Sequence, residues 1–500
     1  MCSAAAAAGG PLKKLVLAVI DGARPAMIDA AVGHGRAPAL AALIERGRFV
    51  RDAVAAFPSV TPVCAATIAT GVGPDRHRIP SMNWYDRAQE RYVEYGSSFR
   101  ASLRFGLARQ LTDTIYNMNG AHLAPDALTV FEQLDDAGLR TAGTTYLIYR
   151  GRHRHEPAQD SALARIAAFA LVRRAVLGPR ELFYADIFAS RETGCRSTLG
   201  RPGVRDQHAG CVGEYLVRHD LFDFLLLSLP DNDNHSHRNG PDAQVFAIAQ
   251  ADRQIARLFE AAGGTEAFLR EHAMIVVADH AHTLVERMVS LGRAFHGFDV
   301  RRPTDLRPVA AGQIAVCPAQ RSAMLYALRE RGAVAQASAV ERIVERARRI
   351  DGVEHVIWRE EGQAVVERGG ERLRFAPGAE GTGEADLRGR RWRLDGEPGV
   401  LGLERDGARV RSRAFPDALG RVWDALACET AGDVLLSAAE GVEFADWGGA
   451  AHVGGGSHGS LGAGDSLAPL IMCGLAGGLE REQWSIADVV PLILEHFGLR

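Results

Sequence analysis

The chain has 500 residues, of which 47% are apolar and 24% charged, and its formal net charge at pH 7 is −3. This length exceeds the usual size of one compact core, so we expect one large α/β domain with insertions, or two domains. The apolar content excludes a disordered chain. Charges of both signs are mixed along the sequence, which gives no electrostatic footprint for nucleic acid or an acidic membrane.

The N-terminal segment MCSAAAAAGGPLKKLVLAVIDG has a short apolar run that follows two lysines and ends in an aspartate. This pattern predicts a first strand rather than a secretory signal, and no apolar stretch reaches the length of a transmembrane segment. The seven cysteines are widely spaced and form no CxxC pair. They are predicted to be buried or free thiols in a reducing compartment, which favours a cytoplasmic protein.

Short apolar runs that end in acidic or polar residues recur along the chain and are typical of central parallel strands covered by helices. They lie at 15–21, 222–231, 273–280, 433–438 and 468–474. Helical patterns lie between them at 37–47, 243–263 and 486–498. Because strands and helices alternate, the sequence predicts an α/β protein with a layered α/β/α core.

Two stretches interrupt this alternation. Residues 85–205 are rich in arginine, tyrosine and helical patterns, and we expect a helical insertion whose amphipathic segment at 162–178 forms a lid rather than a membrane-surface helix. Residues 285–426 are predicted to form a smaller α+β cap with a hairpin at 364–378. The catalytic core would then comprise residues 1–284 and 427–500.

Ligands bind beyond the carboxyl ends of strands in open α/β sheets, so polar residues that follow apolar runs are candidates for chemistry. Asp21 follows the first run and is predicted to be either a metal ligand or a helix N-cap. Thr61, followed by Pro62, marks a helix start. Its hydroxyl can cap that helix, or it can act as a nucleophile that the helix N-terminus stabilises.

The segment 229–241 contains two interleaved D-x-x-x-H pairs, which are Asp231 with His235 and Asp233 with His237. Asp279 and His280 end another apolar run, and a glycine-rich loop presents His458. Three aspartates, three histidines and one hydroxyl form the mixture of nitrogen and oxygen ligands that zinc accepts. This set is large enough for two ions, which can together stabilise an in-line displacement at phosphorus.

In these motifs and their order, the chain resembles the type I phosphodiesterase/nucleotide pyrophosphatase family of the alkaline phosphatase superfamily, over roughly 12–85, 220–285 and 430–500. The resemblance implies an alkaline-phosphatase-like core. It selects Thr61, ahead of Thr70-Gly71, as the nucleophile. The family pattern D-x-x-x-H-x-x-G selects Asp233 and His237 rather than Asp231 and His235.

The resemblance also implies two divalent ions, zinc or alternatively manganese, with Thr61 between them. One ion would be held by Asp21, Asp279 and His280, and the other by Asp233, His237 and His458. The chain departs from the family after the nucleophile, where Val63, Cys64 and Ala65 stand in place of an asparagine. Asn83 is the nearest candidate for the family's asparagine that contacts the phosphoryl oxygen.

The predicted function is hydrolysis of a small phosphate ester, as a phosphodiesterase or nucleotide pyrophosphatase, through a covalent phosphothreonine. The alternatives are a phosphomonoesterase or a phosphonate hydrolase of the same superfamily, and a non-catalytic metal-binding protein. No sulfatase motif of the form C/S-x-P-x-R surrounds Thr61. The sequence contains no transmembrane or nucleic-acid-binding signature, and it predicts no particular oligomeric state.

Overall fold

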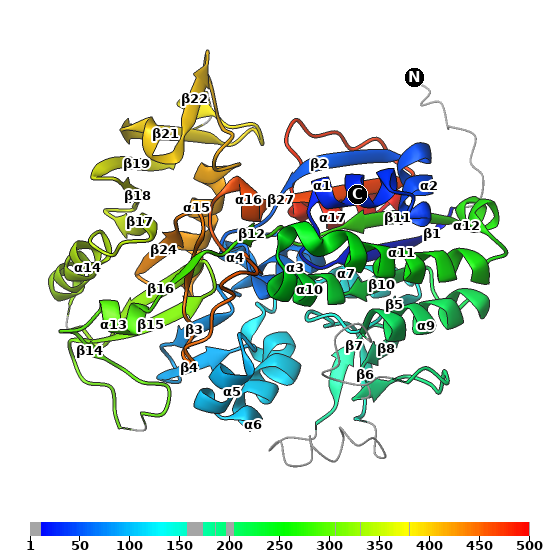
Figure 1. The fold of residues 1–500 in the computed structure, drawn as a ribbon, viewed down its shortest axis with the longest axis horizontal. Helices are drawn as coiled ribbons and strands as arrows, with labels where there is room; N and C mark the ends of the chain where they lie inside the picture. Colours follow the sequence, from blue (N-terminus) through cyan, green and yellow to red (C-terminus); the bar gives the residue numbers. More distant parts are fainter. Residues whose placement is uncertain are drawn as a thin grey trace.

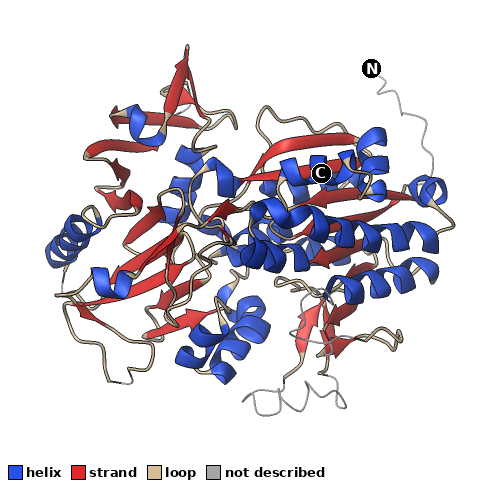
Figure 2. Ribbon diagram, in the orientation of Figure 1, coloured by secondary structure: helices blue, strands red, loops and turns tan. Residues whose placement is uncertain are grey.

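The computed structural model describes residues 12–157, 174–185, 187–196, 205–305, 307–330, 332–379 and 381–499. Two sheets organise this part of the chain, one of eight strands and one of eleven (Figure 1). Figure 2 shows that helices gather around the eight-stranded sheet, whereas strands dominate the part that holds the eleven-stranded sheet.

The eight-stranded sheet has the order β2-β27-β11-β1-β10-β5-β8-β9. Its strands are β1 (Lys14–Ile20), β2 (Arg48–Val54), β5 (Thr141–Gly143), β8 (Glu181–Tyr184), β9 (Phe188–Ala189), β10 (Phe224–Leu229), β11 (His272–Val277) and β27 (Leu467–Cys473). β1 pairs in parallel with both β10 and β11, as the apolar runs predict. β27 is antiparallel to β11 and β2, so the expectation of a parallel strand at 468–474 was wrong.

Every residue of β10 and β11, and all of β1 after Lys14, is buried. Helices therefore cover both faces of this sheet. One group packs around α11 (Gln244–Ala261), with α9 beside it in Figure 1. The others in that group are α1 (Pro25–Gly33), α2 (Pro38–Arg46), α9 (Arg205–Arg218) and α12 (Thr265–Glu271). A second group contains α3 (Thr61–Thr70), α4 (Pro74–His77), α7 (Val130–Asp136), α15 (Ala418–Ala427), η4 (Ile486–Asp488) and α17 (Val489–His496).

The eleven-stranded sheet has the order β14-β15-β16-β24-β17-β18-β19-β21-β20-β23-β22. Its strands are β14 (Asp299–Val300), β15 (Gln313–Ala319), β16 (Ser322–Ala327), β17 (Val353–Glu360), β18 (Gln363–Arg368), β19 (Glu371–Pro377), β20 (Glu384–Ala385), β21 (Arg391–Gly396), β22 (Leu403–Asp406), β23 (Arg409–Ser412) and β24 (Val434–Ala438). The helices of this region are α13 (Leu291–Ala294), α14 (Ala333–Ala347) and η3 (Pro398–Leu401). β18 and β19 form the hairpin predicted at 364–378. The strand predicted at 433–438 forms as β24, but it lies between β16 and β17 instead of in the core sheet.

The segment 85–205 differs from the expected helical insertion. Its first half is helical, with α5 (Phe99–Phe105), α6 (Leu107–Thr112), η1 (Asp113–His122) and α7 after the hairpin β3 (Asn83–Asp86) and β4 (Arg91–Glu94). Its second half supplies β5, β8 and β9 to the core sheet, together with the pair β6 (His153–His155) and β7 (Val176–Gly178). Most of the helix predicted at 162–178 lies outside the described residues, and its end forms β7.

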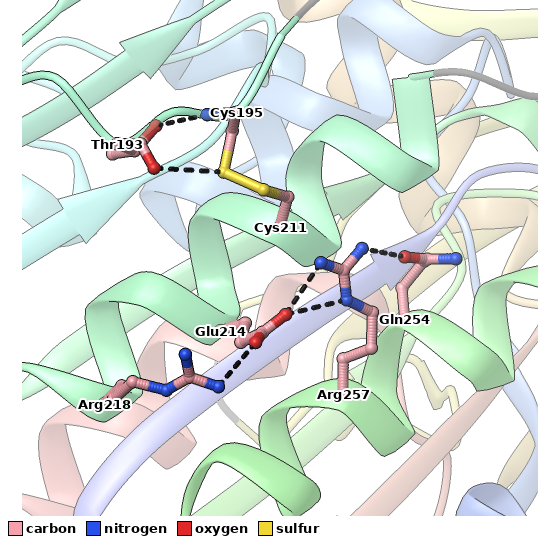
Figure 3. Close-up of a disulfide and its surroundings, with 7 residues drawn as sticks. All are labelled: Thr193, Cys195, Cys211, Glu214, Arg218, Gln254 and Arg257. Atoms are coloured by element: carbon pink, nitrogen blue, oxygen red, sulfur yellow. Dashed lines mark hydrogen bonds and ion pairs between the residues drawn. A yellow bond between two sulfur atoms is a disulfide. The ribbon is translucent and has the colours of Figure 1, made fainter.

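A disulfide joins Cys195 to Cys211, which lies on α9 (Figure 3). The prediction that all the cysteines are thiols was therefore wrong for this pair, whose partners are 16 residues apart and carry no CxxC spacing. Four others are buried free thiols, namely Cys64, Cys317, Cys428 and Cys473. The cytoplasmic location stays a prediction, and the disulfide removes part of its support because such bonds persist in oxidising compartments. Among the described helices, none is both long and apolar enough to cross a bilayer.

Candidate metal centre

The predicted ligands meet at one edge of the eight-stranded sheet. Because β1 is parallel to β10 and β11, the carboxyl ends of these three strands lie side by side. Asp21 follows β1, the helix α10 (Asp231–Asn239) follows β10, and Asp279 lies two residues after β11. The arrangement is the one expected for a ligand site in an open α/β sheet.

The helix α10 places the two interleaved D-x-x-x-H pairs on different faces. Asp233 and His237 are four residues apart and therefore share one helical face, where His237 Nε2 lies 3.2 Å from Asp233 Oδ1. Asp231 and His235 each come two residues earlier on α10, so they lie on the opposite side of the helix. Asp231 accepts hydrogen bonds from Arg205 Nε and from the Asp206 backbone N–H, while His235 Nε2 lies 3.1 Å from the carbonyl oxygen of Ala243.

A short antiparallel pair brings the two histidine-bearing loops together. β12 (Thr283–Leu284) follows the 279–282 loop and pairs with β26 (Gly456–Ser457), which directly precedes His458. The loops are also fixed by Asp465 on α16 (Ala463–Ser466), which is fully buried. Its carboxylate accepts hydrogen bonds from Thr283 Oγ1 and from the Ser460 N–H, and it forms a buried ion pair with Arg321. A second two-stranded pair lies next to these loops in the sequence, in which β13 (Arg287–Val289) runs parallel to β25 (Val442–Phe444).

The first cluster consists of Asp21, Asp279 and His280, whose ligand atoms lie within 4.8 Å of one another. His280 Nε2 is 3.4 Å from Asp279 Oδ2 and 3.7 Å from Asp21 Oδ1. The hydroxyl of Thr61 lies 3.2 Å from the same nitrogen. These are the three residues predicted to hold one ion, together with the predicted nucleophile.

The second cluster surrounds Asp233 Oδ1. The Nε2 atoms of three histidines lie close to it: His282 at 3.0 Å, His237 at 3.2 Å and His458 at 3.5 Å. His237 and His458 are the predicted ligands, whereas His282 is absent from the predicted set. The sequence did contain a signal for His282, which is the second histidine of the segment ADHAH at 278–282. The family's D-H pair includes only the first histidine of that segment. The ring of His282 fits because Gly22 has no side chain, since a Cβ there would lie 2.4 Å from His282 Nε2.

The pKa values of several buried groups are shifted at this edge. Burial, reinforced by the neighbouring carboxylates of Asp279 and Asp233, raises the pKa of Asp21 well above its usual range. Burial also raises the pKa of Asp279 to about 7 and lowers the pKa of His280 to about 3, so that imidazole is neutral at pH 7. Although burial opposes the ionisation of Asp233, His237 and His282 hold its pKa well below its usual range.

The donor set fits divalent ions. Asp21 Oδ1 and His458 Nε2 are buried and have no hydrogen-bond partner within the described part of the chain. The Nδ1 atom of His458 lies 2.8 Å from the carbonyl oxygen of Ser59, and that of His237 lies 2.7 Å from the carbonyl oxygen of Gly456. In the neutral ring these contacts favour the tautomer in which Nδ1 carries the hydrogen and Nε2 is left to present a lone pair, as in ligating histidines.

Thr61 is the first residue of α3 and not its cap. The N-cap position is occupied by Val60, and no side chain caps this helix. The alternative in which the Thr61 hydroxyl caps α3 was therefore wrong, and the hydroxyl is directed to His280. Asp21 likewise caps no helix, because the N-cap of α1 is Arg24.

Asn83 makes its hydrogen bond outside this arrangement. It is buried in β3, and its Nδ2 donates to the carbonyl oxygen of Val93 on β4. In the described residues no hydrogen bond joins it to Thr61 or to either cluster. A different carboxamide reaches the site, that of Gln320, whose Nε2 lies 3.4 Å from His237 Nε2. Its position between β15 and β16 gave no motif by which the sequence could identify it.

Comparisons with known proteins identify the family and the fold. The model of the family described as type I phosphodiesterase / nucleotide pyrophosphatase matches residues 15–369. No curated protein matches the chain. Among solved structures, phosphonoacetate hydrolase from Sinorhizobium meliloti 1021, in complex with phosphonoformate, is 20% identical, with a TM-score of 0.55 and 97% of each chain covered.

Two further solved structures are ectonucleotide pyrophosphatase/phosphodiesterase 5 from mouse and from human. The murine protein, in an inactive form with AMP, is 11% identical with a TM-score of 0.56, and the human protein is 12% identical with a TM-score of 0.55. Each comparison covers 98% of this chain and 96% of the ectonucleotide pyrophosphatase/phosphodiesterase chain. These likenesses confirm the predicted alkaline-phosphatase-like α/β fold.

Proposed function

Because the chain belongs to the type I phosphodiesterase / nucleotide pyrophosphatase family, we propose that it hydrolyses phosphate diesters or nucleotide pyrophosphates through Thr61 and two divalent ions. Membership makes the chain a metal-dependent phosphoric ester hydrolase. The observation that carries the finer proposal is the Thr61 hydroxyl, which caps no helix and lies 3.2 Å from His280 Nε2 beside the Asp/His clusters.

Asp21, Asp279 and His280 would hold one ion, and Asp233, His237 and His458 the other. Divalent ions at such sites neutralise developing charge and lower the pKa of attacking hydroxyl groups. Zinc suits this mixture of imidazole and carboxylate ligands, and manganese is the alternative.

The protein's own groups have separate tasks. The oxygen of Thr61 forms a bond to phosphorus, and the bond from phosphorus to the leaving alcohol or phosphate breaks. Thr61 is the first residue of α3, so its hydroxyl lies at the positive end of that helix, whose dipole can stabilise negative charge there. Water then cleaves the bond between phosphorus and Thr61, which releases the product and restores the hydroxyl. His280 is neutral at pH 7, as an imidazole that holds an ion must be.

A substrate panel tests the proposal. Bis-p-nitrophenyl phosphate, a nucleoside pyrophosphate, p-nitrophenyl phosphate and phosphonoacetate would each be assayed with zinc or manganese, alongside Thr61→Val. The last substrate is included because the Sinorhizobium phosphonoacetate hydrolase has the same fold. We expect the first two to be the best substrates and Thr61→Val to lose turnover while keeping its metals. Preference for phosphonoacetate, or undiminished turnover in Thr61→Val, would contradict the proposal.

A further inference from the structure

Gln320 reaches the metal centre from the eleven-stranded sheet. It lies in the tight turn between β15 and β16, is only 7% exposed, and has a left-handed backbone with φ +58°. Such a conformation costs free energy for a residue with a side chain and is concentrated at functional sites. The turn is therefore held in place by its surroundings rather than by its own preference.

Backbone contacts fix this turn against the His458 loop. The Arg321 N–H donates to the carbonyl oxygen of His458, and the Phe444 N–H donates to the carbonyl oxygen of Gln320. Gly459 permits the close approach, since a Cβ at that position would lie 3.1 Å from the Arg321 backbone nitrogen. The position of Gln320 is thus tied to that of a predicted metal ligand.

The carboxamide of Gln320 has an incomplete set of partners. Its Nε2 lies 3.4 Å from His237 Nε2, the ring nitrogen that is left for an ion because His237 Nδ1 contacts the Gly456 carbonyl. Its Oε1 is buried and, among the described residues, has no hydrogen-bond partner. The amide therefore lies beside the ring nitrogen by which His237 would hold an ion. That nitrogen could not accept a hydrogen bond while it held an ion, so the amide hydrogens would need another acceptor.

We propose that Gln320 is a substrate-binding residue whose amide donates a hydrogen bond to a phosphoryl oxygen of the bound ester. This inference rests on the proposed function. It assigns to Gln320 the contact for which the family resemblance offered Asn83, whose Nδ2 donates to the Val93 carbonyl oxygen. A hydrogen bond to an anionic oxygen is stronger than one between neutral groups, so one such contact has a measurable effect on affinity.

Gln320→Gly is the test variant, because glycine removes the amide and tolerates the left-handed backbone without strain. Glu361→Gly is the matched control, since Glu361 is also left-handed, with φ 50°, but is exposed in the turn between β17 and β18. Metal content would be measured by elemental analysis, and the binding of inorganic phosphate to the metal-loaded proteins by calorimetry. Hydrolysis of bis-p-nitrophenyl phosphate gives KM and kcat.

We expect Gln320→Gly to keep its metals and its melting temperature, and to bind phosphate about 10- to 100-fold more weakly, with a corresponding increase in KM. The control should match the parent protein throughout. Phosphate affinity equal to that of the parent would overturn the assignment. So would the loss of one metal equivalent, because Gln320 would then be a metal ligand.

The proposed function can fail separately. If the parent protein binds phosphate and Gln320→Gly does not, but neither hydrolyses any ester, the binding role of Gln320 stands and the hydrolase reaction is refuted. If the parent protein hydrolyses esters and Gln320→Gly has unchanged KM and phosphate affinity, the reaction stands and the role of Gln320 is refuted.

Discussion

Replacing Asp465 by asparagine should weaken both the fold and the metal centre. The carboxylate is fully buried and accepts hydrogen bonds from Thr283 Oγ1 and from the Ser460 N–H, at 2.6 and 2.8 Å, besides its ion pair with Arg321. Removing the charge leaves the Arg321 guanidinium, 3% exposed, buried without a counter-charge. Breaking a buried pair in this way costs about 3–5 kcal/mol, a large part of the roughly 5–15 kcal/mol that stabilises a typical domain.

A matched control separates general instability from an effect on the site. Asp113 is also buried, pairs with Arg91, and lies on η1, where it contacts neither cluster within the described part of the chain. We expect Asp113→Asn and Asp465→Asn to lower the unfolding midpoint in urea by similar amounts. Only Asp465→Asn should also lose metal, because the loops bearing His282 and His458 depend on it. Equal metal content in the two folded variants, or an unchanged midpoint for Asp465→Asn, would refute the reasoning.

Three further outcomes are expected. His237→Ala should lower turnover by at least about 100-fold because it removes a ligand, whereas His235→Ala should stay near the parent rate; the reverse order in steady-state kinetics would shift the assignment to the other pair. Metal affinity should rise with pH up to about 7 and then level off, because Asp279 must lose the proton that its raised pKa retains below that pH; calorimetry showing tighter binding at pH 5 than at pH 7 would contradict this. Mass spectrometry should find a peptide cross-linked through Cys195 and Cys211 before reduction and none after it.

Much of the core could be predicted from the sequence, because continuous apolar runs between helical patterns are specific to buried strands. The same runs do not encode direction or sheet membership. β27 is apolar on both faces whether it runs parallel or antiparallel, and β24 is equally apolar in the second sheet. β5 has only three residues, too few to give a period, so its place in the core sheet was hidden within a segment that resembled a helical insertion.

The candidate site shows the same division. Asp21 and Asp279 could be identified because parallel strand ends must meet. The two D-x-x-x-H pairs have equal spacing, so the choice of Asp233 and His237 came from the family pattern. His282 and Gln320 were not in the predicted set, because each reaches the site through tertiary packing. His282 depends on the space left by Gly22, and Gln320 depends on a turn of the second sheet that packs on the His458 loop.

Trapping of the reaction on Thr61 tests the central claim most directly. The metal-loaded protein would be quenched in acid during turnover of a diester, and its peptides analysed by mass spectrometry, with Thr61→Val as the control. We predict a phosphoryl adduct on the peptide that contains Thr61 in the parent protein and none in the variant. Rapid turnover by Thr61→Val with both metals bound, or an adduct on a different residue, would contradict the account.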